Sequence, residues 1–115
     1  RKERWHTPAY ALLVAGVVGA AAAVLSGNSA ADPHRQAAVA EVVETHEDLA
    51  TGTLIVFMVT TLGRLPLALR HRVGWPLFAW IALAVVGCVL LWLTSLHGGE
   101  LVYLHGVGVS ADPLP

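Results

Sequence analysis

Three of the six histidines in this 115-residue chain are placed where they could share one ligand. His46 precedes the second long apolar stretch, His97 ends the third, and His105 follows eight residues later. On an unbroken helix His97 and His105 would be about 80° apart. We therefore expect a ligand between the second and third helices to meet His46 on one side and His97 or His105 on the other.

The chemistry of the group favours haem over other metals. Imidazole binds haem iron, zinc and copper. The lone Cys88 and the lone Met58 lie deeper in the apolar stretches, which argues against a thiolate zinc site or a blue-copper site. A b-type haem between two histidines fits better, and Gly98 and Gly99 would let a macrocycle approach the backbone. The sequence thus predicts cofactor binding by His46, His105, His97, Gly98 and Gly99, with His46 and His105 as metal ligands.

A simpler interpretation stays open beside this one. The same histidines could pair with Glu44, Glu47 or Glu100, or cap a helix end, and form only a polar cluster at the membrane surface. A proton or quinone site is a further candidate, because a histidine beside a glutamate is a usable donor and acceptor pair.

The elements that would position these residues are apolar helices. Apolar residues make up 56% of the chain and charged residues 13%, against about 25% charged in an ordinary soluble domain. A helix needs about 20 apolar residues to cross a bilayer. We predict an all-α transmembrane helical bundle in a single domain, residues 1–115, with spans at 8–26, 47–64 and 75–97. An interfacial extension over 33–46 would join the second span in one helix that ends at Pro66.

The charges predict an orientation. Six of the seven basic residues lie before the first span or between the second and third, and seven of the eight acidic residues lie elsewhere. The positive-inside rule then puts residue 1 and the loop 64–74 in the cytoplasm, and the loop 27–48 and the C-terminus outside. The balance of seven basic and eight acidic residues excludes a nucleic-acid binder.

Two motifs are similar to those of a known family. Residues 97–109 read HGGELVYLHGVGV, and residues 44–50 read ETHEDLA with Thr53 following. They resemble the closing signature GGxLVYxHGVGV and the THExxA motif of a bacterial four-helix membrane family of unknown function. The resemblance covers most of the chain. It implies a bacterial inner-membrane protein associated with Rieske and cytochrome components, in which His46 and His105 matter most.

The chain departs from that family at two places. The family usually has an apolar or aromatic residue where His97 stands, and its first span, with a His-Pro-x-x-x-His pattern, has no counterpart here. We therefore expect the chain to be a fragment of a four-span unit.

Two functions follow as hypotheses. The first is a subunit of an electron-transfer complex, not a stand-alone enzyme, with haem b near the outer face. It would pass electrons between quinol and a periplasmic Rieske or cytochrome c-type partner, and quinone is a second candidate ligand. The alternative is a cofactor-free structural or accessory subunit of a respiratory or photosynthetic complex. Both assume other membrane subunits and the lipid bilayer as partners. A transporter is disfavoured because no charge lies inside the apolar stretches 8–26, 49–63 and 75–96.

Overall fold

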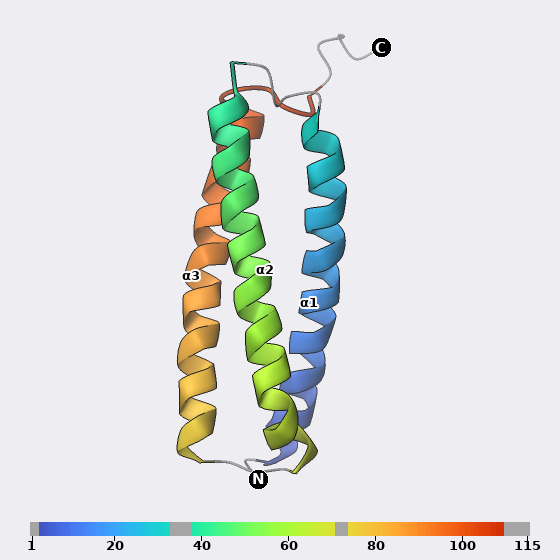
Figure 1. Cartoon of the computed structure of the whole chain (residues 1–115), viewed down its shortest axis with the longest axis vertical. Coiled ribbons are helices and arrows are strands. Elements are labelled where there is room, and N and C mark those ends of the chain that lie inside the picture. Colours follow the sequence, from blue (N-terminus) through green and yellow to red (C-terminus); the bar gives the residue numbers. More distant parts are fainter. Residues whose placement is uncertain (1–2, 33–37, 71–73, 110–115) are drawn as a thin grey trace.

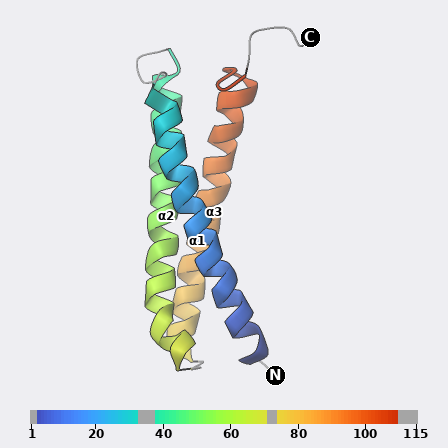
Figure 2. The ribbon, with the colours of Figure 1, turned by 90° about the vertical axis from the view of Figure 1, so that its right-hand side faces the viewer.

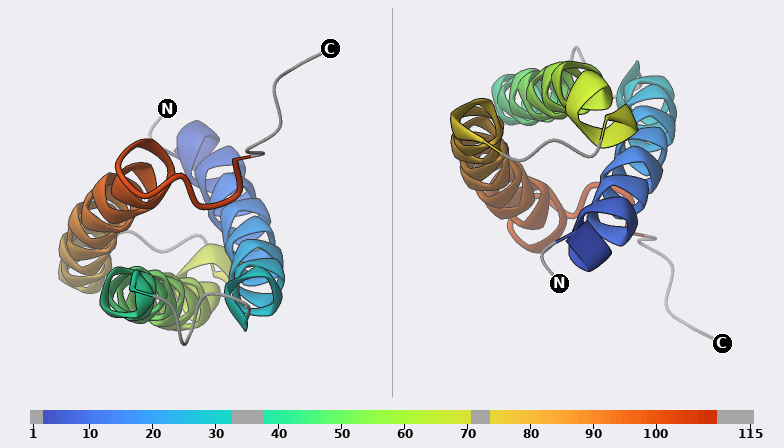
Figure 3. Two further views of the ribbon diagram at one scale, coloured as in Figure 1. Left: turned by 90° about the horizontal axis from the view of Figure 1, so that it is seen from above. Right: turned by 90° about the horizontal axis from the view of Figure 1, so that it is seen from below.

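The computed structural model describes residues 3–32, 38–70 and 74–109, and this part of the chain forms three helices and no strand. These are α1 (Glu3–Ala31), α2 (Ala40–Leu69) and α3 (Trp75–Tyr103). They run up, down and up, with α2 packed against both of the others (Figures 1 and 2). Seen along the bundle axis, they form a triangle (Figure 3). The predicted all-α bundle is confirmed.

Each helix is long and apolar enough to cross a membrane. The three candidate spans have 28, 30 and 29 residues, which at about 1.5 Å per residue exceeds a hydrocarbon core of about 30 Å. Large apolar side chains are exposed along them, for example Trp92 at 69% and Val18 at 65%. Such exposure is costly in water and favourable against lipid. The chain is therefore a membrane protein.

The bounds of α2 differ from the sequence prediction at both ends. We expected one helix from residue 33 to 63. Residues 33–37 lie outside the described part of the chain, Ala38 and Val39 form a turn, and the helix begins at Ala40. Pro66 does not end the helix, which continues to Leu69, and the Arg70 N–H donates to the Pro66 carbonyl at 3.2 Å. In the last turn a proline removes only one helical hydrogen bond and is tolerated.

The packing of α3 on α2 places aromatic rings against glycine backbone. A Cβ on Gly63 would overlap the Trp80 indole, and a Cβ on Gly87 would lie 2.9 Å from the Phe57 ring. Small residues let transmembrane helices approach closely, so that van der Waals packing can hold them together. These two contacts fix the rotation of α3 relative to α2 and hence which side chains meet at the site.

Threonines are among the most deeply buried residues of α2. Thr60 is fully buried and Thr53 is 4% exposed. The hydroxyl of each donates to the carbonyl four residues before it, at 2.8 Å for Thr60 and 2.7 Å for Thr53. Because every buried hydroxyl needs a partner in an apolar medium, these bonds within the helix let threonine replace an apolar residue at little cost.

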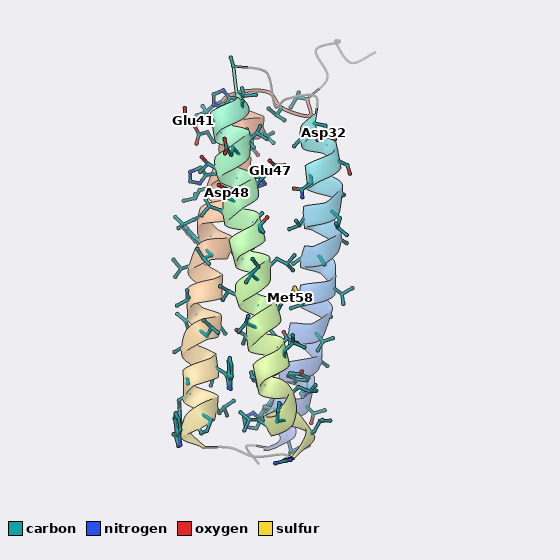
Figure 4. All side chains as sticks on the ribbon, viewed as in Figure 1. Asp32, Glu41, Glu47, Asp48 and Met58 are labelled. Carbon is teal, nitrogen blue, oxygen red and sulfur yellow. The ribbon has the colours of Figure 1, made fainter. Side chains whose placement is uncertain are left out.

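At the end of the bundle that carries Arg64, side-chain contacts join α1 to α2. The Tyr10 hydroxyl donates to the Thr61 carbonyl at 2.8 Å, and the Arg64 guanidinium lies 5.8 Å from the centre of the Tyr10 ring. The opposite end, which we call the His46 end, carries acidic side chains, whereas Met58 lies farther down the bundle. Figure 4 shows Asp32, Glu41, Glu47 and Asp48 gathered there.

Candidate functional site

His46 lies on the side of α2 that faces α3, and its ring is held by a backbone carbonyl. It is half-buried, and its Nδ1 lies 3.0 Å from the Thr94 carbonyl oxygen. A carbonyl oxygen can only accept, so Nδ1 must carry the proton and donate it. In the neutral ring this leaves the lone pair on Nε2. The arrangement fixes both the tautomer and the orientation of the imidazole.

Gly98 makes room for this ring. It stands one turn after Thr94 on α3, and a Cβ built on it would lie 3.0 Å from Cε1 and 3.4 Å from Nδ1 of His46. Carbon atoms prefer separations of about 3.5–4.0 Å, so a larger residue would push the ring away from Thr94. The group that approaches Gly98 in the structure is the His46 ring; the approach of a macrocycle to this glycine stays a prediction.

A second polar contact lies one layer deeper between the same helices. The Thr53 and Thr94 hydroxyl oxygens are 3.2 Å apart, and Thr94 is 9% exposed. Each hydroxyl also donates to a carbonyl of its own helix, Leu49 for Thr53 and Leu90 for Thr94. The contact sets the two backbones side by side, so that the Thr94 carbonyl meets His46.

A cavity of about 370 Å³ adjoins His46 between the three helices. This volume lies within the range of about 300–1,000 Å³ that is typical of small-molecule sites. The lining is mostly apolar, and much of the space exists because α1 presents alanine and glycine there. The lining residues are Ala20, Ala23, Val24, Gly27, Asn28, Ala30, Ala31, Val43, His46, Glu47, Ala50, Thr53, Leu91, Thr94, Leu101 and Val107.

The other two histidines of the predicted site have separate partners. His97 is half-buried, and its Nδ1 donates to the Leu93 carbonyl of its own helix at 2.9 Å. His105 follows the end of α3, and its Nε2 lies 3.7 Å from Oε1 of Glu100. Neither belongs to the described residues that line the cavity. The structure thus brings His46 together with Gly98 and with the cavity, but puts His97 and His105 at other contacts.

Gly99 differs from its neighbour Gly98. A Cβ on Gly99 would meet only Tyr103, at the ordinary distance of 4.0 Å from Cδ2. Helix α3 runs through both glycines without a break. Of the predicted pair, Gly98 alone contacts the His46 ring by this measure.

Sequence reasoning missed several residues that shape the site. Thr53 and Thr94 were detectable as polar residues inside apolar stretches, but nothing in the sequence showed that they would face each other. Val107 joins the cavity lining through the fold of the chain after α3. The alanines of α1 that line the cavity carry no chemical signal in the sequence.

Within the described ranges, no group of three or more His, Cys, Asp and Glu side chains is placed to hold a metal ion. The cavity instead offers one imidazole, the neighbouring Glu47, two threonines and Asn28 in an apolar wall. Such a set can coordinate a metal that brings most of its own ligands, or hydrogen-bond a planar organic molecule.

Fold and site together define an all-helical membrane protein with an apolar cavity beside a single fixed imidazole. The chain belongs to the family of predicted membrane proteins known as DUF2231, which matches residues 1–111. No curated protein and no solved structure matches the chain.

Proposed function

We propose that this chain is a membrane subunit of an electron-transfer complex and that His46 would hold the iron of a b-type haem. One observation carries the proposal. The His46 ring borders an apolar cavity, and its Nδ1–H is engaged by the Thr94 carbonyl, so that the Nε2 lone pair is left for a metal. Histidines that bind metals in proteins almost always donate their other N–H to a carbonyl, a carboxylate or water.

The cavity lining supplies one residue that can bind haem iron, His46. None of the other described lining residues is His, Cys or Met, the usual partners of haem iron. His105 is the candidate for the opposite position, because it stands two residues before Val107, on the turn that borders the cavity. To serve there, it would have to give up its contact with Glu100.

When bound, the haem would supply one-electron chemistry, and the chain's own residues would tune its potential. The hydrogen bond from Nδ1–H to the Thr94 carbonyl would raise the basicity of Nε2 toward the iron, which would favour the ferric state. The mostly apolar lining would disfavour net charge on the bound group. Glu47, in the same lining, is positioned to accept a proton if quinol is the electron donor.

The place of the protein in the cell belongs to the same proposal. Among the described residues, Arg4, Arg64 and Arg70 lie at the Arg64 end, whereas Asp32, Glu41, Glu47 and Asp48 gather at the His46 end (Figure 4). The positive-inside rule then puts the His46 end on the outer face of a bacterial inner membrane. A periplasmic Rieske or cytochrome c-type partner could receive electrons there, with other membrane subunits alongside.

The test is the reduced-minus-oxidised visible spectrum of the purified full-length protein and of His46→Gln. Glutamine keeps a polar amide on this helix face but is not a usual ligand of haem iron, so the variant removes ligation without making the face apolar. The α-band of a b-type haem should be present in the wild type and lost in H46Q. The matched control is His97→Gln, which removes an imidazole outside the cavity and should leave the band intact.

Two results would contradict the proposal. An α-band that survives in H46Q would remove His46 as a ligand. A wild-type protein without the band, isolated with its complex intact, would leave the cofactor-free accessory subunit as the function. The His105→Gln variant tests whether this chain also supplies the second ligand. Loss of the α-band in this variant would identify His105 as that ligand.

A further inference from the structure

The chain does not leave the bundle directly after α3. Residues 104–109 turn back across the His46 end, from α3 towards α1 (Figures 1 and 3). The Gly106 N–H donates to the Val102 carbonyl at 3.1 Å, and the Val107 N–H donates to the Leu101 carbonyl at 2.9 Å. These bonds satisfy the last carbonyls of the helix, as a C-terminal cap does.

Two glycines give the turn its shape. Gly106 and Gly108 have φ of +65° and +77°, in the left-handed region that residues with a Cβ rarely adopt. A further bond, from the Val109 N–H to the Gly106 carbonyl at 3.1 Å, closes the second half of the turn.

The result is that Val107 alone in the turn reaches the cavity. Val107 is half-buried and belongs to the lining, together with the buried Leu101 on the last turn of α3. Val109 is 59% exposed and is not part of the lining. The two valines of the GVGV stretch thus have different environments, although they are two residues apart.

We propose that residues 104–109 form a cap in which the Val107 side chain limits the access of water and polar solutes to the cavity from the His46 end. The N–H groups of Leu104, Gly106 and Val107 donate to carbonyls of α3, while the apolar side chain of Val107 lies in the cavity lining. These three backbone hydrogen bonds and the contact between His105 and Glu100 attach the cap to the helix. Few bonds of this kind permit local opening without unfolding of the helices. The proposal does not depend on what the cavity holds.

The test measures how fast a cysteine inside the cavity reacts with a polar reagent. Cys88 is exposed on α3 and is first replaced by alanine. Ala50, half-buried in the cavity lining, is then replaced by cysteine. The full chain is placed in lipid nanodiscs, where both faces are accessible, and the thiol is modified with a negatively charged methanethiosulfonate. Val107→Ala is compared with the matched control Val109→Ala.

Removing the two methyl groups of Val107 should raise the rate of modification about tenfold, because less apolar surface then holds the cap over the cavity. Val109→Ala should change it less than about twofold, since its side chain is exposed. A cysteine at the exposed Ser29 must react equally in all variants, which shows that the bundle is intact. Gly106→Ala, which strains the turn without touching the lining, should also accelerate modification. Equal rates for the cavity thiol of Ala50→Cys in V107A, V109A and the parent would overturn the proposal.

Discussion

Replacing Gly98 by alanine should break the hydrogen bond that orients His46. The new methyl carbon would lie 3.0 Å from Cε1 and 3.4 Å from Nδ1. To restore a separation of about 3.5–4.0 Å the ring must retreat by about 0.5–1 Å. The Nδ1 to Thr94 oxygen distance, now 3.0 Å, would then pass the limit of about 3.2 Å for a good hydrogen bond.

The size of the effect follows from that bond. A hydrogen bond is worth about 0.5–1.5 kcal/mol net in proteins and averages about 0.6 kcal/mol in a membrane protein. Because 1.4 kcal/mol is a factor of ten, the population of the Nδ1–H tautomer relative to Nε2–H should fall about threefold to tenfold.

The assay is the ¹⁵N imidazole spectrum of the haem-free protein, with the His46 signals assigned by their loss in His46→Gln. Gly99→Ala is the matched control. Gly99→Ala raises helix propensity by the same amount as Gly98→Ala, about 1 kcal/mol. The Cβ at position 99, however, meets only Tyr103, at 4.0 Å. The tautomer ratio should be unchanged in G99A. A ratio in G98A equal to that of the wild type and G99A would refute the geometry of the site.

Three other predictions concern the bundle. Gly63→Ala should lower the free energy of unfolding by about 1–3 kcal/mol, because its methyl group overlaps the Trp80 indole. In a protein that already carries Trp80→Leu, Gly63→Ala should lower the free energy of unfolding by less. An equal loss with and without Trp80 would rule out the contact. Tyr10→Phe should cost about 0.5–1.5 kcal/mol in the same denaturant titration, since it removes the bond from α1 to an α2 carbonyl; no change would show that the bond contributes nothing. With Cys88 replaced, a cysteine at Ala38 should be labelled from outside intact cells and one at Leu69 should not, whereas the reverse pattern would overturn the positive-inside assignment.

The fold was predictable because it depends on the length of the apolar stretches and not on which face of each helix is apolar. Three long apolar stretches are enough to indicate three helices, and Pro76 after Gly74 marks the start of the third. The ends of α2 were less predictable. Pro66 is a strong stop signal in water, but one missing N–H in the last turn is a small loss when the surrounding helix is packed and apolar.

The site was predictable only in part, because the helices are apolar around most of their surface. Sequence patterns then give the depth of a residue along the membrane normal but not the direction in which it points. His46, His97 and His105 were correctly grouped at one end of the bundle. Only the rotation of α3 on α2, fixed by Gly63 against Trp80 and the Gly87 contact, decides that His46 meets Thr94.

The cavity was beyond sequence reasoning for a related reason. Small residues in a membrane helix usually predict close packing against a neighbour. Gly27 and the alanines of the same half of α1 instead border open space next to His46. Whether such a face touches a helix or lines a cavity depends on the angle between the helices, which no local pattern specifies.

The most direct test of the central claim is chemical rescue of the axial ligand. In His46→Gly the imidazole is removed, and the space it leaves adjoins the apolar cavity. We predict that the purified variant loses the α-band in its reduced-minus-oxidised spectrum, and that the band returns when free imidazole and haem are added. A band that persists in the variant without imidazole would contradict ligation by His46.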